Sequence, residues 1–138
     1  MKHYSIIILL LLVVAAGCGS GQVGLKGTVV FDDDGSPLTT GTVIFTTATF
    51  QARGNIDGQG TFTMGSFGEK DGLPPGTYQV GITGATVASN PVLDYDLITS
   101  KWASPATSGC EITVEKGMKS LEIRVERNPN TKPVKKLL

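Results

Sequence analysis

The residues of this chain that could do chemistry are two cysteines, a single histidine and a few closely spaced aspartates. Cys18 has the most informative surroundings, because it directly follows three small residues at positions 15–17. A cysteine thiol at that place could carry a covalent lipid. His3 lies near the start of the chain, so residues 18–138 hold no histidine that could act as a general base or a metal ligand.

Residues 1–17 have the order of a secretion signal. Lys2 supplies a positive charge, residues 6–16 form an apolar run, and small residues then precede Cys18. The run is shorter than the roughly 20 residues that a membrane-spanning helix needs. The arrangement resembles the bacterial lipobox, whose cysteine receives a diacylglycerol and becomes the new N-terminus, although Ala15 stands where that motif prefers leucine. The alternative is an ordinary signal peptide that is cut elsewhere, with Cys18 incidental.

The residues after Cys18 bear on location. Gly19 and Ser20 follow it, and lipoproteins without aspartate at that second place generally go to the outer membrane of bacteria with two membranes. We therefore expect an exported chain that is held at the outer membrane, on its periplasmic or surface face, by acyl chains on Cys18 and that uses no other cofactor. Each buried methylene contributes about 0.8 kcal/mol, so two or three acyl chains anchor firmly.

Charge and cysteine content narrow the functional classes. The chain has 12 basic and 12 acidic side chains, and a neutral chain lacks the electrostatic attraction that nucleic-acid binding requires. Acylation of Cys18 would leave Cys110 alone, so no disulfide is expected. Cys110 is in phase with Ile112 and Val114, which predicts a buried thiol that acts as a small hydrophobe.

Alternating apolar and polar residues predict an all-β chain. Val114, Ile123 and Val125 belong to the two clearest segments, in which charged residues occupy the other face. Turn-forming residues separate the segments, and no helical period appears. The pattern favours a seven-stranded antiparallel Greek-key β-sandwich. Its expected strands are residues 25–31, 42–47, 50–56, 61–66, 77–83, 110–115 and 121–126.

The same pattern predicts the organisation of the chain. A signal-peptide helix at residues 1–17 and a flexible tether at 18–23 precede the sandwich at 24–127, and a disordered tail follows at 128–138. Within the sandwich, residues 85–107 show no clean alternation and are expected to form a long loop, of the kind that is often functional or mobile.

Several turn motifs together carry a family resemblance. They are Asp34-Gly35-Ser36-Pro37-Leu38, Asp57-Gly58-Gln59-Gly60-Thr61-Phe62 and Leu73-Pro74-Pro75-Gly76-Thr77-Tyr78. The series resembles the carboxypeptidase regulatory-like, or transthyretin-like (prealbumin-like), domain, and more narrowly the small bacterial lipoproteins that carry one such domain. In those proteins a segment like residues 101–109 precedes the penultimate strand, and an apolar residue usually stands at the place of Cys110. The resemblance implies a sandwich that accompanies activity rather than performing it.

Catalysis is not expected. One transthyretin-like branch hydrolyses a purine-pathway intermediate with histidines and a Tyr-Arg-Gly-Ser ending, and neither feature is present in residues 18–138. Asp32, Asp33 and Asp34 could bind calcium, but the ligands of an EF-type loop alternate whereas these are adjacent, so an exposed polar turn is favoured and no metal is expected.

Residues 85–107 hold the candidate ligand-binding side chains. Asp94 and Asp96 are alternate and could face one ligand, although a solvated loop is favoured. Trp102 and Tyr95 could form an apolar platform for a sugar ring or a peptide, and the competing interpretation is that Trp102 clamps the loop to the sandwich. Tyr78 is expected to anchor a corner, with its ring buried and its hydroxyl bonded to nearby backbone.

These observations predict a membrane-anchored, non-enzymatic lipoprotein whose sandwich is a structural or protein-interaction module of the cell envelope. The alternative is a carbohydrate- or peptide-binding module that uses residues 85–107. The expected partners are the membrane, through the lipid on Cys18, and an envelope protein or glycan.

Overall fold

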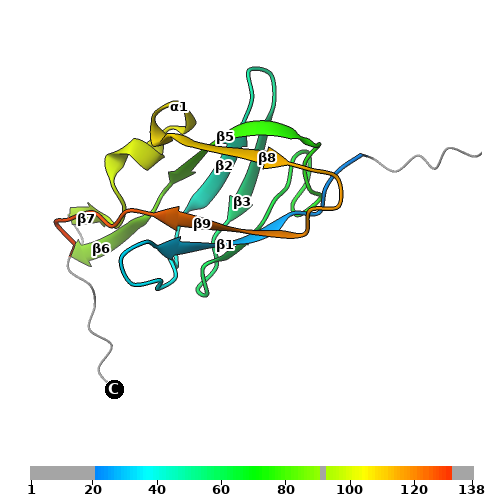
Figure 1. Cartoon of the computed structure of the whole chain (residues 1–138). Helices are drawn as coiled ribbons and strands as arrows, with labels where there is room; N and C mark the ends of the chain where they lie inside the picture. Colours follow the sequence, from blue (N-terminus) through cyan, green and yellow to red (C-terminus); the bar gives the residue numbers. More distant parts are fainter. Residues whose placement is uncertain (1–20, 91–92, 132–138) are drawn as a thin grey trace, which may run out of the picture.

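The computed structural model describes residues 21–90 and 93–131, and this part of the chain forms nine β-strands and two short helical turns (Figure 1). The strands are β1 (Lys26–Phe31), β2 (Thr42–Thr46), β3 (Gln51–Asn55), β4 (Thr61–Thr63), β5 (Gly76–Thr83), β6 (Thr86–Asn90), β7 (Leu93–Asp96), β8 (Cys110–Val114) and β9 (Ser120–Val125). The helical turns are η1 (Ser100–Ala103), which is a 3₁₀ turn, and α1 (Pro105–Ser108).

Seven of these strands form two facing sheets. One sheet has the order β4-β1-β9 and the other has the order β3-β2-β5-β8, while β6 and β7 form a separate ribbon. The predicted all-β sandwich is therefore confirmed. Its largest fully buried side chains lie between the sheets and include Phe45, Phe62, Leu25, Leu38, Met64, Leu73 and Ile82.

One strand pair departs from the antiparallel prediction. β1 and β9 are parallel, with Lys26 beside Ser120 and Phe31 beside Val125. Adjacent strands joined by a tight turn must be antiparallel, but β1 and β9 are the first and last strands and share no turn. Their relative direction is therefore set by how the rest of the chain returns to the sheet, which local patterning does not encode.

The segment 85–107 is not the irregular loop that alternation predicts, because it contains β6, β7, η1 and α1. The β6–β7 ribbon lies outside both sheets and leaves Val87 and Tyr95 exposed, so no buried face imposes a period of two. The helical turns have four residues each, which is too short to show a helical period.

α1 is fixed on the outer face of β5 by a close backbone approach. A Cβ at Gly81 would lie 2.8 Å from the ring nitrogen and Cδ of Pro105, so only glycine allows the contact. Ser108 is buried, donates its hydroxyl to the carbonyl of Val80 and accepts the N–H of Cys110 at 3.1 Å. These contacts hold α1 against the sandwich.

The corner at the start of β5 has the predicted anchor. Tyr78 is 2% exposed, its hydroxyl donates to the carbonyl of Pro74 at 2.7 Å, and its ring lies 5.8 Å from that of Phe45. The residues that make this corner are thus bound to one another within a few positions of the chain.

The ends of the sandwich differ slightly from the expected boundaries. Val23, inside the expected tether, is buried and forms a two-way backbone bridge with Leu73. Asn128, in the expected tail, donates its N–H to Leu97 at 2.9 Å. The expected signal peptide, Cys18 and residues 132–138 lie outside the described residues. No helix in the described residues is long and apolar enough to cross a membrane.

Candidate functional site

Residues 65–72, here called the 65–72 loop, connect β4 to β5 and are organised by one carboxylate. Asp71 accepts the backbone N–H groups of Ser66 at 2.6 Å, Gly68 at 2.9 Å and Phe67 at 3.2 Å. The N–H of Ser66 contributes most to lowering the pKa of Asp71 below its ordinary value of 3.8; desolvation opposes the shift, and the other two N–H groups reinforce it. The loop is therefore a fixed structure rather than a loose connection.

The base of the loop touches the edge of β3. Gly65 and Arg53 exchange both backbone hydrogen bonds, at 2.8 and 2.9 Å, so this part of the β3 edge is already paired. A Cβ at Gly65 would lie 2.3 Å from the carbonyl oxygen of Gly68 and 2.8 Å from the nitrogen of Lys70. Lys70 itself has a φ of 61°, an uncommon conformation for a residue other than glycine.

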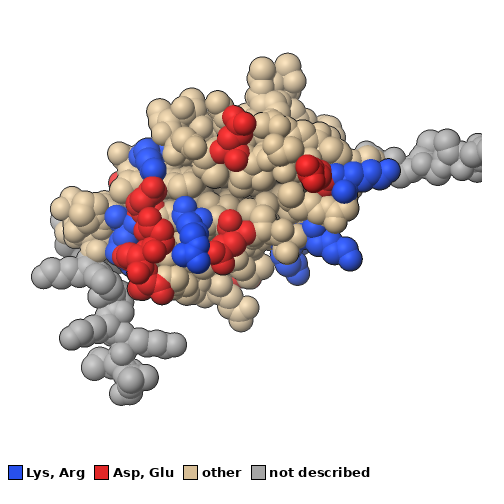
Figure 2. Space-filling model, in the orientation of Figure 1, with Lys and Arg blue, Asp and Glu red and all other residues tan. Residues whose placement is uncertain are grey.

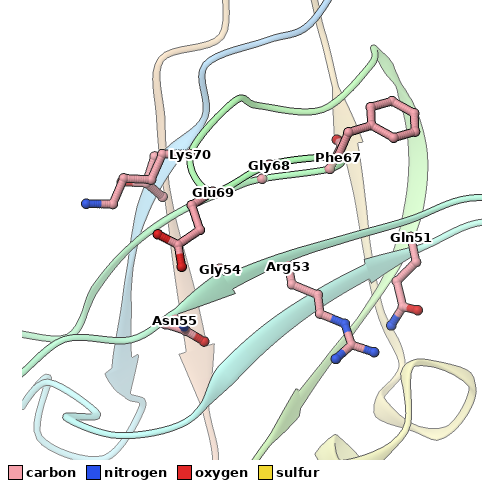
Figure 3. Close-up of a pocket in the computed structure, with 11 residues that line it drawn as sticks. Gln51, Arg53, Gly54, Asn55, Phe67, Gly68, Glu69 and Lys70 are labelled. Carbon is pink, nitrogen blue, oxygen red and sulfur yellow. The ribbon is translucent and has the colours of Figure 1, made fainter.

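A groove of about 670 Å³ lies between the 65–72 loop and β3. Its lining is mainly polar and includes Gln51, Arg53, Asn55, Ser66, Glu69 and Lys70. Figure 3 shows Glu69 pointing from the loop toward β3, while Gln51 and Arg53 point to the same side of that strand. Polar side chains of both charge signs therefore border the groove.

Phe67 projects from the rim of this groove. It is 86% exposed, more than Val87 or Tyr95, the other exposed large hydrophobic residues of the described chain. Its ring makes an edge contact with Phe50, with the ring centroids 6.0 Å apart. Single exposed apolar residues are common on protein surfaces, so it is the fixed loop beneath the ring, and not its exposure alone, that distinguishes Phe67.

The loop lies at the end of the sandwich where the described chain begins. Val23 bridges to Leu73, and the hydroxyl of Ser66 donates to the carbonyl of Gly72 and lies 3.4 Å from Oε1 of Gln22. The 65–72 loop thus neighbours the residues that follow Cys18 in sequence.

The sequence gives only weak signs of this site. The segment Gly65-Ser66-Phe67-Gly68 places one aromatic residue among small turn-forming residues, which indicates an exposed ring. The contact with Gln22 cannot be seen in the sequence, because it joins residues far apart in the chain. The hydrogen bonds of Asp71 are local, and the aspartate that closes this turn-rich segment is the sign that could have found them.

The candidate ligand-binding residues of segment 85–107 are not brought together as a platform. Trp102 is 4% exposed and belongs to the core, whereas Tyr95 and Asp96 are exposed on β7. The side chain of Asp94 lies outside the described residues. Tyr95 is therefore left without an indole face beside it on which a ligand could stack.

Glu126 holds Trp102 in place. The indole N–H of Trp102 donates to one carboxylate oxygen of Glu126 at 2.7 Å, and Lys101 bonds the other at 2.5 Å. Burial raises the pKa of Glu126, but the hydrogen bonds from Lys101 and Trp102 outweigh burial and lower it below its ordinary value of 4.5. The carboxylate is thus used to fasten η1 to the end of β9.

The aspartate cluster after β1 is bound to an arginine. Arg127 donates to Asp33 at 2.8 Å and to Asp34 at 3.3 Å, and its guanidinium carbon lies 3.7 Å from the ring centroid of Phe31. The Ser36 hydroxyl is the largest contribution to lowering the pKa of Asp34. The part of the chain that the structure describes contains no group of three or more His, Cys, Asp or Glu side chains arranged for a metal.

Cys110 is less buried than its phase predicts. It is a free, partly buried cysteine on β8, and burial is the main cause that raises the pKa of its thiol. β8 is an edge strand, so its inward side chains are covered from one side only. A raised thiol pKa disfavours the reactive thiolate.

The hydrogen bonds of Asp71 predict a loss of stability in acid. The pKa of Asp71 is lower in the folded chain than in the unfolded chain, so as pH falls the unfolded chain takes up the proton first. The stabilisation from the ionised carboxylate is therefore complete above pH 3.8, the ordinary pKa, and is lost as pH falls through the folded-state pKa. We expect Asp71→Asn to destabilise the protein above about pH 5 and to reduce the fall in stability toward about pH 3, as measured by denaturant unfolding at each pH.

The matched control is Glu69→Gln, which removes a carboxylate of the same loop that accepts no hydrogen bond in the described residues. If the free energy of unfolding fell as steeply toward low pH in Asp71→Asn as in the wild type, the Asp71 carboxylate would not be the group that makes the stability of the loop depend on pH.

Comparisons with known proteins assign this chain to no family. No protein-family model matches the sequence, and no curated protein matches it. Among solved structures, the major pilin subunit BcpA of Bacillus cereus is similar to 78% of this chain, with 15% sequence identity and a TM-score of 0.49. This chain spans 30% of the pilin. The sandwich assignment therefore rests on the strand pairings of this chain.

Proposed function

We propose that this protein is an exported lipoprotein, anchored in the outer membrane through acyl chains on Cys18, whose β-sandwich is a non-enzymatic structural or protein-interaction module of the cell envelope. The observation that carries the proposal is the order of residues 1–18, in which a cationic start, an apolar run and three small residues precede the cysteine. This segment supports both the cell-envelope location and the lipid anchor.

The structure supports this proposal in two ways. Val23, the first buried residue described, comes only five residues after Cys18, so an anchored sandwich would be held close to the bilayer. The polar groups that could have suggested catalysis serve the fold instead: Asp71 organises a loop, Glu126 holds Trp102, and Arg127 binds Asp33. The alternative of a ligand platform in residues 85–107 loses its central aromatic ring, because Trp102 is buried.

The test is the mass of the protein extracted from membranes. We expect the wild type to begin at Cys18 and to carry added acyl mass, and Cys18→Ser to lack that mass and to leave the membrane fraction as a mature chain or remain as an uncut precursor. Cys110→Ser is the matched control, because it removes the other cysteine and should keep the acyl mass. A soluble, unmodified mature wild-type chain would refute the proposal.

A further inference from the structure

We infer that the 65–72 loop is a second membrane contact, in which Phe67 enters the interfacial region of the bilayer and the lysines around it face anionic lipid headgroups. This inference rests on the proposed function, because it takes the lipid anchor on Cys18 as its starting point. It adds a fixed orientation: the sandwich stands on the membrane with one defined end down.

The chain between the anchor and the loop is short. Gln22 comes four residues after Cys18, and four extended residues span at most about 14 Å. Ser66, the neighbour of Phe67, lies 3.4 Å from Gln22, and Val23 is bridged to Leu73. An acylated Cys18 would therefore hold Phe67 close to the bilayer surface.

The ring of Phe67 is presented by a rigid support. Phe67 is 86% exposed, yet its own N–H and those of its two neighbours are bonded to Asp71. Because the loop is already ordered, insertion of the ring does not require further ordering of the backbone. The anchor also raises the effective concentration of the ring at the bilayer, so even a weak contact would be populated.

Lysines lie at the same end of the sandwich as the 65–72 loop. Lys26 donates its N–H to Lys119 at 3.1 Å, Lys70 belongs to the 65–72 loop, and Lys116 lies in the turn between β8 and β9 at the same end of the sandwich. Figure 2 shows basic side chains around the end where the described chain begins. Glu69, Asp71 and Glu115 also lie at this end, so lysines and carboxylates are interspersed around the 65–72 loop. The lysines beside the apolar ring supply the positive groups that can pair with anionic headgroups.

A peptide strand is a less suitable occupant. Addition of a strand to β3 would need free backbone groups along that edge, and Arg53 already exchanges both of its hydrogen bonds with Gly65. The exposed ring would also lie between the sandwich and the membrane in the anchored protein. A lipid surface fits both the position and the chemistry of the loop.

The experiment is quenching of tryptophan fluorescence by lipids with brominated acyl chains. Phe67→Trp places an indole at the tip of the loop, and Tyr95→Trp is the matched control on the exposed β6–β7 ribbon at the opposite end. The acylated proteins are reconstituted in vesicles of brominated phosphatidylcholine and phosphatidylglycerol, and the wild type, whose only tryptophan is the buried Trp102, supplies the baseline.

We expect Phe67→Trp to lose about half of the emission of its added indole, since a ring about 5–10 Å inside the headgroup boundary comes within reach of the bromine atoms. Tyr95→Trp should be quenched no more than the wild type. Absence of quenching in acylated Phe67→Trp, or equal quenching in both variants, overturns the inference and leaves the lipoprotein intact, with the ring free for a protein or glycan partner. Absence of acyl mass in the same samples overturns the proposed function and, with it, this inference.

Discussion

Trp102→Ala is expected to lower the free energy of unfolding by about 3–5 kcal/mol, as truncation of a buried tryptophan typically does. Trp102 is 4% exposed and packs in the core, so its removal leaves a cavity. It also removes the indole N–H that Glu126 accepts at 2.7 Å. Both losses act where η1 meets the sandwich. Denaturant unfolding followed by circular dichroism measures the change.

Two variants separate the causes of this loss. Trp102→Phe keeps an aromatic ring but has no N–H for Glu126, so it should fall between the wild type and Trp102→Ala. Phe67→Ala truncates an aromatic residue that is 86% exposed and should stay within about 0.5 kcal/mol of the wild type. If Trp102→Ala were as stable as Phe67→Ala, the ring would not be part of the core in solution.

Gly65→Ala should have the second-largest effect, a loss of about 1–3 kcal/mol, which is typical of adding a methyl group where no space exists. The new Cβ would lie 2.3 Å from the carbonyl oxygen of Gly68 and 2.8 Å from the nitrogen of Lys70, and both atoms are backbone that cannot rotate away. The loop must therefore shift, and the hydrogen bonds of Asp71 would weaken. Denaturant unfolding and limited proteolysis within residues 65–72 report the two effects.

Gly68→Ala provides the control within the same loop. A Cβ there meets only Oδ2 of Asp71, at 3.7 Å, which is an ordinary contact. We expect nearly unchanged stability and protease resistance. Equal losses in both variants would mean that the loop requires glycine for flexibility in general and not for the close approach at Gly65.

The strands could be predicted because each has a local pattern. All seven segments expected from the sequence correspond to strands, namely β1 to β5, β8 and β9. The fourth ends earlier than expected, at Thr63, because Gly65 turns away to pair with Arg53. The Tyr78 corner could also be predicted from the sequence, since Pro74 and Tyr78 are close in sequence and their hydrogen bond closes a local loop.

The candidate site could not be predicted in the same way. Phe67 in the sequence is one aromatic residue in a turn, and only the fold brings its neighbour Ser66 to Gln22 and places the ring at the groove along β3. Trp102 shows the opposite case, because its neighbours in sequence are polar or small, whereas its turn η1 packs against β5 and its indole N–H bonds Glu126, just after β9. Both positions depend on residues far away in the chain.

The sequence by itself therefore determined the class of fold, because a sheet with one buried and one solvent-exposed face requires alternating apolar and polar side chains, and this alternation is a local property of the sequence. The prediction of a lipid on Cys18 also rests on the sequence alone. The tertiary structure decided that β1 runs parallel to β9, that Trp102 is buried and that Phe67 is held out beside the start of the sandwich. Each of these features is a contact between segments distant in sequence, and such contacts are set by the packing of the whole chain.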